Sequence, residues 1–400
     1  MGSYGKIALT HEDEETVIRI CQDLIRAKGG SGHEEAAGQV LVSYYRQLGY
    51  DEALIDDYGN AVGVINGNRP GKCLVFDGHI DTVQAVESQW SVDPFGGVRK
   101  DGRIYGRGTS DMKGAIAAFT LAAPVFARAC GRDFHGKIVV AGTVQEEAYE
   151  GVASVGINDA YHPDLVIIGE ASDMNLKIGQ RGRAEILVET IGTTAHSAHP
   201  ERGNNAILAM CKVIDAIGRI PTPEDPKLHK GIMVLTDIIS EPFPAKSCVP
   251  YRCLATYDRR LLKGETRESV LAPISEALAA LEAADPTVRT KVSYAHETSR
   301  CYTGKTISSE KFFPAWLFEE SEGFVQTALA GLRADGFDPL LSVYDFCTNG
   351  SLYAGELGIP TLGFGPSRED LAHSVDEYIE IGELTKAAAC YVSVLGALTK

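Results

Sequence analysis

Paired cysteines, long apolar runs and a secretion signal are all missing from this sequence. Its nine cysteines include no CxxC pair, and an odd number cannot close into a complete disulfide set, so we expect reduced thiols. No stretch approaches the roughly 18 uninterrupted apolar residues of a membrane-spanning helix. The segment from Met1 to Glu14 has no apolar core of the kind found in signal peptides. We therefore expect a cytoplasmic protein that does not contact a membrane.

Positive charge is also scarce. The chain has 38 Lys and Arg residues against 54 Asp and Glu, for a formal net charge of -16. Such a field repels phosphate backbones, and no local run of basic residues offsets it, so we expect no nucleic-acid partner. The 44% hydrophobic content is typical of a globular protein with a sizeable core. A length of 400 residues favours two domains over one.

Short apolar runs that end in polar turns recur in the first and last parts of the chain. They lie at residues 73–76, 138–141, 165–168 and 360–364, and helical stretches such as 113–129 separate several of them. This alternation predicts an α/β fold with a mixed central sheet flanked by helices. In such sheets ligands gather beyond the carboxyl ends of the strands.

The middle of the chain has a different order of elements, β-α-β-β-α-β, which is the ferredoxin-like α+β arrangement. Its strands are expected near residues 184–190, 232–238, 248–257 and 288–294, and its helices near 204–217 and 267–284. We therefore predict one domain formed by residues 1–182 and 296–400, with a second domain inserted at 183–295.

Five candidate metal ligands stand in loops of the α/β part: His79, Asp111, Glu147, Glu170 and His373. Two imidazoles and three carboxylates are a donor set that suits zinc. A site for two ions needs one bridging carboxylate, and we assign that role to Asp111. Glu147 and His373 would then complete one ion, and His79 and Glu170 the other.

Two neighbouring features support this assignment. Asp81 follows His79 closely, and we expect it to accept the second imidazole N–H and so fix the tautomer. Glu146 and Glu147 are adjacent like charges after a buried strand, and they repel each other unless a cation lies between them. Taken singly, Asp111 could cap the helix that follows it, and the glutamate pair could be a solvated acidic turn. The convergence of five candidates favours a metal site.

Six motifs follow one another in a specific order. They are Gly78-His79-Ile80-Asp81-Thr82-Val83, residues 106–114, Glu146-Glu147, residues 195–200 with 203–206, residues 257–260, and Ala372-His373-Ser374. In this order the chain resembles, over nearly its whole length, the co-catalytic zinc peptidase family that includes aminoacylase, carboxypeptidase G and succinyl-diaminopimelate desuccinylase. Finer similarity, at residues 347–351 and 368–379, is to a bacterial subgroup linked to selenium-dependent purine metabolism.

The resemblance implies roles that the residue pattern alone does not give. It implies two Zn²⁺ ions per chain, with Co²⁺ or Mn²⁺ as alternatives, and Glu146 as the general base. It implies that residues 183–295 form a lid that mediates a homodimer, from which His196 donates to the oxyanion in the partner's active site. The implied substrate contacts are Asn205, Gly350 with Ser351, and Arg260 as a carboxylate clamp, with Arg259 competing for that role.

Together these residues predict a metal-dependent hydrolase of an amide bond in a small substrate with a free carboxylate, such as an N-acyl amino acid or a dipeptide-like compound. Hydrolysis of an N-carbamoyl or ureido compound at the same site stays open, because residue types do not separate the two. A non-catalytic binding module on the same fold is the alternative from another class. The chain has no HExxH or GxSxG motif, and Gly304-Lys305-Thr306 lacks the upstream glycine of a P-loop.

Overall fold

The computed structural model describes residues 7–400, which form two compact units. The first comprises the chain up to Gln180, Thr298–Ile307 and Leu317–Lys400, and the second comprises Arg181–Glu297 and Ser308–Trp316. The second unit thus contains a segment outside the insertion that we expected at 183–295. The reason is that β17 (Phe312–Phe313) pairs with β9 (Gly182–Ile191), the central strand of that unit.

The first unit is built on a nine-stranded sheet with the order β1-β2-β6-β3-β7-β20-β8-β18, to which β19 adds by pairing with β8. β3 (Arg69–His79) runs parallel to both of its neighbours, β6 (His135–Thr143) and β7 (Leu165–Ile168), whereas β2 runs antiparallel to β6. The predicted mixed sheet is confirmed. The remaining strands are β1 (Glu52–Ile55), β2 (Ala61–Asn66), β8 (Leu176–Gln180), β18 (Trp316–Leu317), β19 (Leu341–Tyr344) and β20 (Thr361–Gly363).

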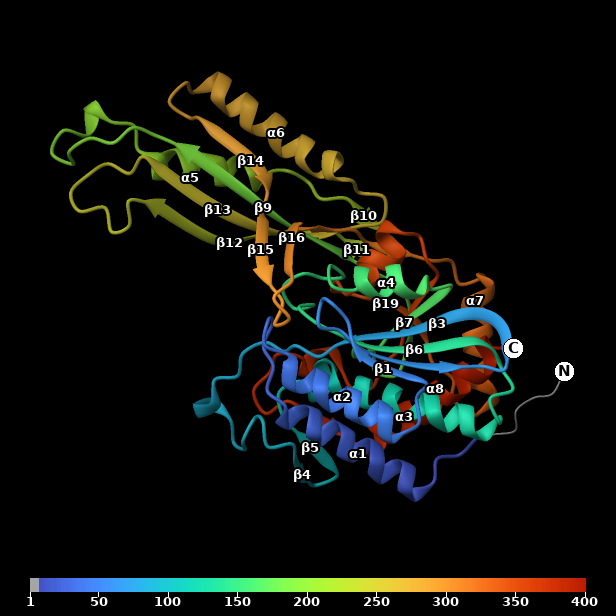
Figure 1. Cartoon of the computed structure of the whole chain (residues 1–400). Helices are drawn as coiled ribbons and strands as arrows, with labels where there is room; N and C mark the ends of the chain where they lie inside the picture. Colours follow the sequence, from blue (N-terminus) through green and yellow to red (C-terminus); the bar gives the residue numbers. More distant parts are fainter. Residues whose placement is uncertain (1–6) are drawn as a thin grey trace. The chain divides into compact units, whose positions relative to one another are not determined.

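Helices cover both faces of this sheet (Figure 1). One core joins the sheet to α1, α2, α3 and α8, and α7 packs on α8. In this core the ring of Phe119 on α3 lies 4.5 Å from that of Phe76 and 4.3 Å from that of Tyr391. A smaller core on the other face packs against α4. The helices are α1 (His11–Arg26), α2 (Glu35–Gln47), α3 (Gly114–Ala129), α4 (Val155–Tyr161), α7 (Gly323–Ala334) and α8 (Ile381–Leu398).

Helix α8 is long and apolar enough to cross a membrane, judged by length and composition alone. Its inward residues, among them Ala388, Tyr391 and Leu395, are buried in the core of the first unit. α8 also packs along α3, whose sequence is apolar on nearly every side. Packing within this core therefore accounts for the apolar composition of α8.

A small three-stranded sheet brings two distant loops together. β21 (Tyr378–Glu380) pairs antiparallel with β5 (Arg103–Tyr105), which pairs in turn with β4 (Val98–Lys100). The residues just after β5 therefore lie beside the residues just before β21. Further along the chain, β15 (His296–Arg300) and β16 (Thr306–Glu310) form a separate two-stranded ribbon.

The second unit has the β-α-β-β-α-β order predicted from the sequence, which is confirmed. Its antiparallel sheet has the order β12-β13-β9-β14, and the buried side chains of β9 pack against α5 and α6. β13 begins later than expected, because Pro250 has no amide hydrogen to offer to the ladder. The elements are α5 (Ala206–Ile217), β12 (Ile232–Glu241), β13 (Arg252–Leu261), α6 (Arg267–Ala284) and β14 (Thr290–Tyr294), with a short ribbon of β10 (Glu224–Asp225) and β11 (His229–Lys230).

Candidate metal centre

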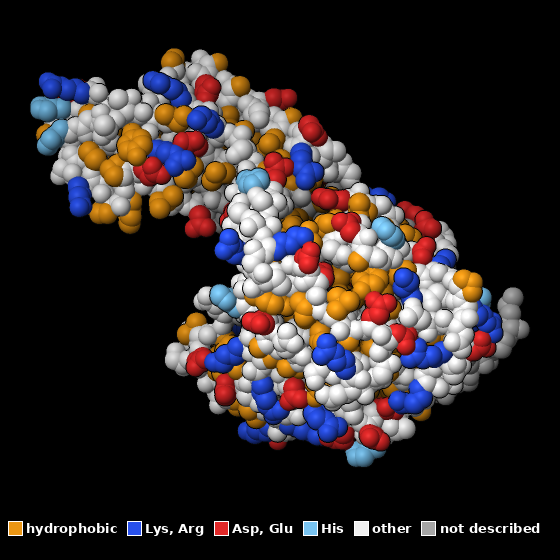
Figure 2. Space-filling view, viewed as in Figure 1, with side chains coloured by type: hydrophobic (Ala, Val, Ile, Leu, Met, Phe, Trp, Pro, Cys, Tyr) orange, Lys and Arg blue, Asp and Glu red, His pale blue; other side chains and the backbone are white. Residues whose placement is uncertain are grey.

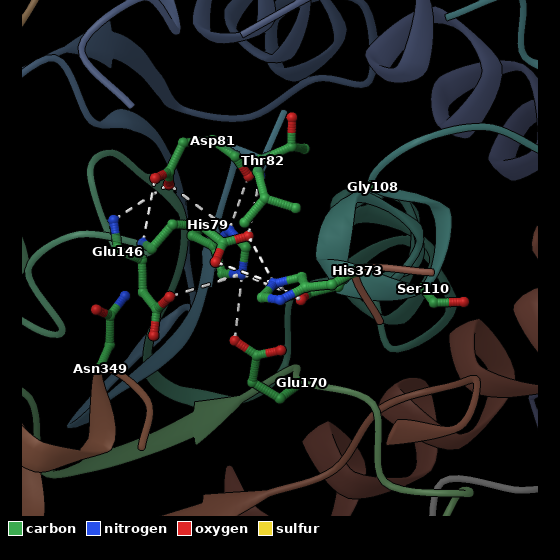
Figure 3. A network of polar contacts seen from close by, with 12 residues as sticks. His79, Asp81, Thr82, Gly108, Ser110, Glu146, Glu170, Asn349 and His373 are labelled. Carbon is green, nitrogen blue, oxygen red and sulfur yellow. Dashed lines mark hydrogen bonds and ion pairs between the residues drawn. The ribbon is translucent and has the colours of Figure 1, made fainter. Parts of the chain in front are cut away.

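Four of the singled-out side chains follow three neighbouring strands of the first unit. His79 is the last residue of β3, Glu146 and Glu147 follow β6, and Glu170 follows β7. Because these three strands are parallel, their carboxyl ends meet at one edge of the sheet. Figure 3 shows Glu146 and Glu170 directed toward the imidazole of His79. The topology of the sheet therefore assembles side chains that are far apart in the sequence.

Asp111 joins the two imidazoles of the site. It lies in the kinked segment Thr109–Lys113 that leads into α3, where its own backbone is extended rather than helical. Its Oδ1 is 2.9 Å from Nε2 of His79, and its Oδ2 is 3.1 Å from Nε2 of His373. One carboxylate thus faces both histidines, each with a different oxygen, as a ligand shared by two metal ions must.

The other two predicted ligands lie one beside each histidine. Oε1 of Glu170 is 3.3 Å from Nε2 of His79, and Oε2 of Glu147 is 3.1 Å from Nε2 of His373. These are the same pairs that the sequence-based assignment placed on separate ions. Ligand atoms of His79, Asp111 and Glu147 also lie within 4.8 Å of one another, as do those of His79, Glu146 and Glu170. All five predicted ligands and Glu146 therefore form one cluster.

The electrostatics of the cluster suit bound cations. Burial and the neighbouring charge of Asp111 raise the pKa of Glu170 to about 7. Burial also opposes ionisation of Asp111, but hydrogen bonds from His373 and His79 hold the pKa of that carboxyl well below its usual range. Hydrogen bonds to Asp111 and Glu147 raise the pKa of His373 to about 10. Carboxylates and imidazoles packed this closely are suitable ligands for cations, which would take the place of the shared protons.

One oxygen of Glu146 is buried and makes no hydrogen bond within the described part of the chain. Its Oε2 lies 3.9 Å from Nε2 of His79, and its buried Oε1 has no hydrogen-bond partner among residues 7–400. Burial raises the pKa of Glu146 well above its usual value, although the charge of His79 opposes the shift. A buried carboxylate oxygen without a donor is costly, which indicates that a water or substrate group belongs beside this atom.

Asp81 supports the cluster in a different way from the one predicted. Nδ1 of His79 lies 2.9 Å from the backbone carbonyl oxygen of Asp81, whereas the nearer carboxylate oxygen is 3.6 Å away. The carboxylate instead accepts the backbone amides of Glu146 and Glu147, at 3.1 and 3.2 Å, and the hydroxyl of Ser31 at 2.7 Å. Asp81 therefore orients His79 through its backbone, and it holds the glutamate turn through its side chain (Figure 3).

Gly350 belongs to a loop that is anchored beneath the sheet edge. Its amide donates to Oγ1 of Thr348 at 3.0 Å. The neighbouring Asn349 donates to the buried carboxylate of Asp77 at 2.7 Å and accepts the amide of Gly151 at 2.6 Å. The loop is therefore rigid, as a pocket wall needs to be.

Two predicted residues lie at loops of the second unit. His196 is exposed, and its Nδ1 accepts the backbone amide of Ala198 at 3.0 Å. In the neutral ring this leaves the proton on Nε2, which is then a hydrogen-bond donor. Asn205 is the N-cap of α5, because its side-chain oxygen accepts the amide of Ile207 at 2.9 Å.

Arg259 and Arg260, the two candidates for the carboxylate clamp, differ in burial. Arg259 is buried, and its Nη2 lies 2.6 Å from Oε1 of Glu265. Arg260 points to the opposite face of β13, is partly exposed, and has its Nε 2.9 Å from Oδ1 of Asp258. Since the guanidinium of Arg259 is buried in an ion pair, Arg260 is the more accessible of the two.

Sequence reasoning missed Arg107 and Glu377, a buried ion pair behind two of the ligand loops. Arg107 lies within the motif at residues 106–114, and Glu377 closely follows His373, so both residues lie in or beside segments that the sequence analysis singled out. However, 270 residues separate them, and no spacing rule links residues at that distance.

A mixed α/β domain that carries two imidazoles and four carboxylates at the carboxyl edge of its sheet has the donor set of a metal-dependent hydrolase. The profile of Peptidase family M20/M25/M40 matches residues 75–397, and the chain belongs to that family. The predicted resemblance is thereby confirmed at the level of the family, and so is a hydrolase that acts on amide bonds. The finer similarity to the selenium-linked subgroup stays a prediction.

The chain is similar to further proteins in sequence and in fold. It is 32% identical over 386 residues to the Uncharacterized protein YgeY of Escherichia coli (strain K12), across 94% of this chain and 93% of that protein. It is 28% identical over 407 residues to the succinyl-diaminopimelate desuccinylase of Methylobacterium radiotolerans, across 97% and 98%. Its fold is similar to that of the Bacillus subtilis YXEP protein, a dinuclear metal binding peptidase, with a TM-score of 0.70 and 12% identity across 98% and 100% of the two chains.

Proposed function

We propose that this protein binds two metal ions, with zinc as the preferred metal. We further propose that it hydrolyses the amide bond of an N-acyl amino acid or a dipeptide-like substrate with a free carboxylate. The observation that carries the proposal is the carboxylate of Asp111 between His79 and His373. Imidazole nitrogens and carboxylate oxygens suit Zn²⁺, and Co²⁺ and Mn²⁺ accept the same donors. The similarity to a desuccinylase and to a dinuclear metal-binding peptidase supports the proposal.

In this proposal Glu146 is the group that moves the proton. Metal ions held by the five ligands would activate a water molecule and polarise the scissile carbonyl. Glu146 accepts the proton of that water at its unused Oε1 and later delivers it to the leaving nitrogen. Asp81 keeps Glu146 in place by accepting its backbone amide.

We also propose that the second unit mediates a homodimer, in which Nε2 of His196 donates to the oxyanion in the partner's active site. Support comes from β12, which is the edge strand of its sheet and exposes Val234, Ile238 and Ile239 by 49%, 50% and 55%. Figure 2 shows exposed hydrophobic side chains on this unit. An unpaired edge with apolar side chains is a template for pairing with a second copy.

Metal content and turnover test the proposed function together. Protein purified without chelator is expected to contain about two zinc ions per chain by elemental analysis and to hydrolyse members of a panel of N-acyl amino acids and dipeptides. Chelation should abolish turnover and added zinc should restore it. Turnover confined to N-carbamoyl amino acids would favour the ureido alternative. Absence of both metal and turnover, even after zinc is added, would favour a non-catalytic binding module.

Arg260→Ala is expected to raise KM for an N-acyl amino acid roughly 10- to 100-fold with little change in kcat, because a charge-assisted contact to the substrate carboxylate is lost. Steady-state kinetics on a matched pair of substrates, one a free acid and the other its carboxamide, would check this. The carboxamide lacks the negative charge and serves as the internal control. An equal rise of KM for both substrates would show that Arg260 does not recognise the carboxylate.

A further inference from the structure

A buried ion pair that the proposed mechanism does not use connects two of the ligand loops. Nη1 of Arg107 donates to Oε2 of Glu377 at 2.6 Å, and both side chains are buried. Arg107 follows β5 and Glu377 precedes β21, so the pairing of these strands brings the two residues together. A buried pair of this kind is costly to desolvate unless further hydrogen bonds satisfy its polar atoms.

The further hydrogen bonds of Glu377 go to the turn that carries Asp111, whereas the buried Nε of Arg107 has no partner among residues 7–400. Oε1 of Glu377 accepts the backbone amides of Ser110 at 2.7 Å and of Asp111 at 3.1 Å. Both of its oxygens lie 3.1 Å from the amide of Gly108. Figure 3 shows Gly108 and Ser110 on the side of the site near His373. A single carboxylate that accepts three backbone amides fixes the path of this turn, and hence the direction of the Asp111 side chain.

The arginine reaches the second ligand loop. Nη2 of Arg107 donates to the backbone carbonyl oxygen of His373 at 3.3 Å. His373 needs such support, because its backbone has a φ of 59°, which lies in the left-handed region that residues other than glycine rarely adopt. Its imidazole is also half-exposed, so packing holds it less firmly than it holds His79. The planar guanidinium fork therefore binds Glu377 with one nitrogen and the His373 loop with another.

We propose that Arg107 and Glu377 are positioning residues that hold Asp111 and His373 together for the metal ion that these ligands share with Glu147. The inference rests on the two-metal site of the proposed function. Among residues 7–400, the hydrogen bonds of the pair reach the loops of Asp111 and His373 but do not reach His79 or Glu170. Because Asp111 faces both histidines and His373 would serve only one ion, loss of the pair should weaken both metal sites, and the site that uses His373 more.

Two conservative variants separate the contacts of the pair. Arg107→Lys keeps the buried positive charge, but a single ammonium cannot replace a fork that contacts both Glu377 and His373. Glu377→Gln keeps the shape, but its amide nitrogen cannot accept a backbone N–H. Arg103→Lys is the matched control. Arg103 lies on the same small sheet and pairs with Glu380 at 2.8 Å, away from both ligand loops.

The test is a titration of the metal-depleted protein with Co²⁺, followed by calorimetry and by the visible absorption of the bound ion. Wild-type protein is expected to bind two ions. Arg107→Lys and Glu377→Gln should weaken the step that uses His373 about 10- to 100-fold more than the other step. A general loss of stability, measured by the melting temperature of the metal-free protein, would instead weaken both steps alike. The control variant should titrate like wild type.

The possible outcomes distinguish the inference from the proposed function. If both steps weaken equally and the melting temperature falls with them, or if neither step changes, the pair has no selective positioning role. Were Glu377→Gln too unstable to purify, the result for Arg107→Lys alone would decide the matter. If wild-type protein itself binds no Co²⁺, the proposed two-metal site fails.

Discussion

Glu146→Gln is expected to lower kcat by roughly 1,000-fold while both metal ions stay bound, because glutamine has the size of glutamate but cannot accept the proton of the attacking water. The structure favours this clean separation, since Oε1 of Glu146 makes no hydrogen bond within residues 7–400 that the substitution would break. The backbone amide that anchors Glu146 to Asp81 is retained as well. Single-turnover kinetics together with elemental analysis of the same preparation would check the prediction.

A matched control is available close by. Glu150 is also a buried glutamate, and the proposed mechanism assigns it no role, so Glu150→Gln should keep most of the wild-type kcat. Activity retained in Glu146→Gln would remove Glu146 from the role of general base. Loss of one equivalent of metal in that variant would instead make Glu146 a ligand beside His79 and Glu170, with which its ligand atom lies within 4.8 Å.

His196→Ala is expected to lower kcat about 100-fold with a small change in KM, because one donor to the developing oxyanion is lost. The position of the proton supports the role, since the amide of Ala198 occupies Nδ1 and leaves Nε2 as the donor. His199 lies in the same exposed loop, and His199→Ala is the control that should change kcat less than twofold. A change within twofold for His196→Ala would make His196 a spectator too.

Mixing two inactive variants would show in which subunit His196 acts. In a heterodimer of Glu146→Gln and His196→Ala, one active site combines an intact Glu146 with an intact His196 only if the histidine comes from the partner. After random subunit exchange, half of the dimers are mixed and each has one competent site, so roughly a quarter of wild-type activity should return. No recovery despite verified exchange would contradict donation between subunits.

Much of the metal centre was predictable because several of its candidate ligands occur in the same local sequence pattern. A buried strand that ends in a polar turn places His79, Glu147 and Glu170 at the ends of their strands, and the parallel order of β3, β6 and β7 then brings those ends together. The fold of the inserted domain was also predictable, since the order of its elements is that of a ferredoxin-like unit, and no knowledge of contacts is needed to recognise it. The second unit extends two residues beyond each end of the predicted insertion, and it also contains the segment 308–316, whose two-residue strand is too short to show a periodic pattern.

Other features have no local signature. Whether the imidazole of His79 meets the carboxylate or the carbonyl oxygen of Asp81 depends on how the backbone turns after β3, and the residue types allow both. The choice between Arg259 and Arg260 depends on which face of β13 is covered, because neighbouring residues on a strand point to opposite faces.

The sequence by itself therefore determined the class of fold and the candidate metal ligands, which depend on residue types and their place in the element order, whereas the candidate base came from the family resemblance. Only the tertiary structure decided which oxygen of Asp111 faces which histidine and which arginine stays accessible. It alone revealed that Arg107 and Glu377 join two ligand loops. The physical reason is that hydrogen bonds and ion pairs act over a few ångströms, and only the folded chain brings residues so far apart in sequence within that range.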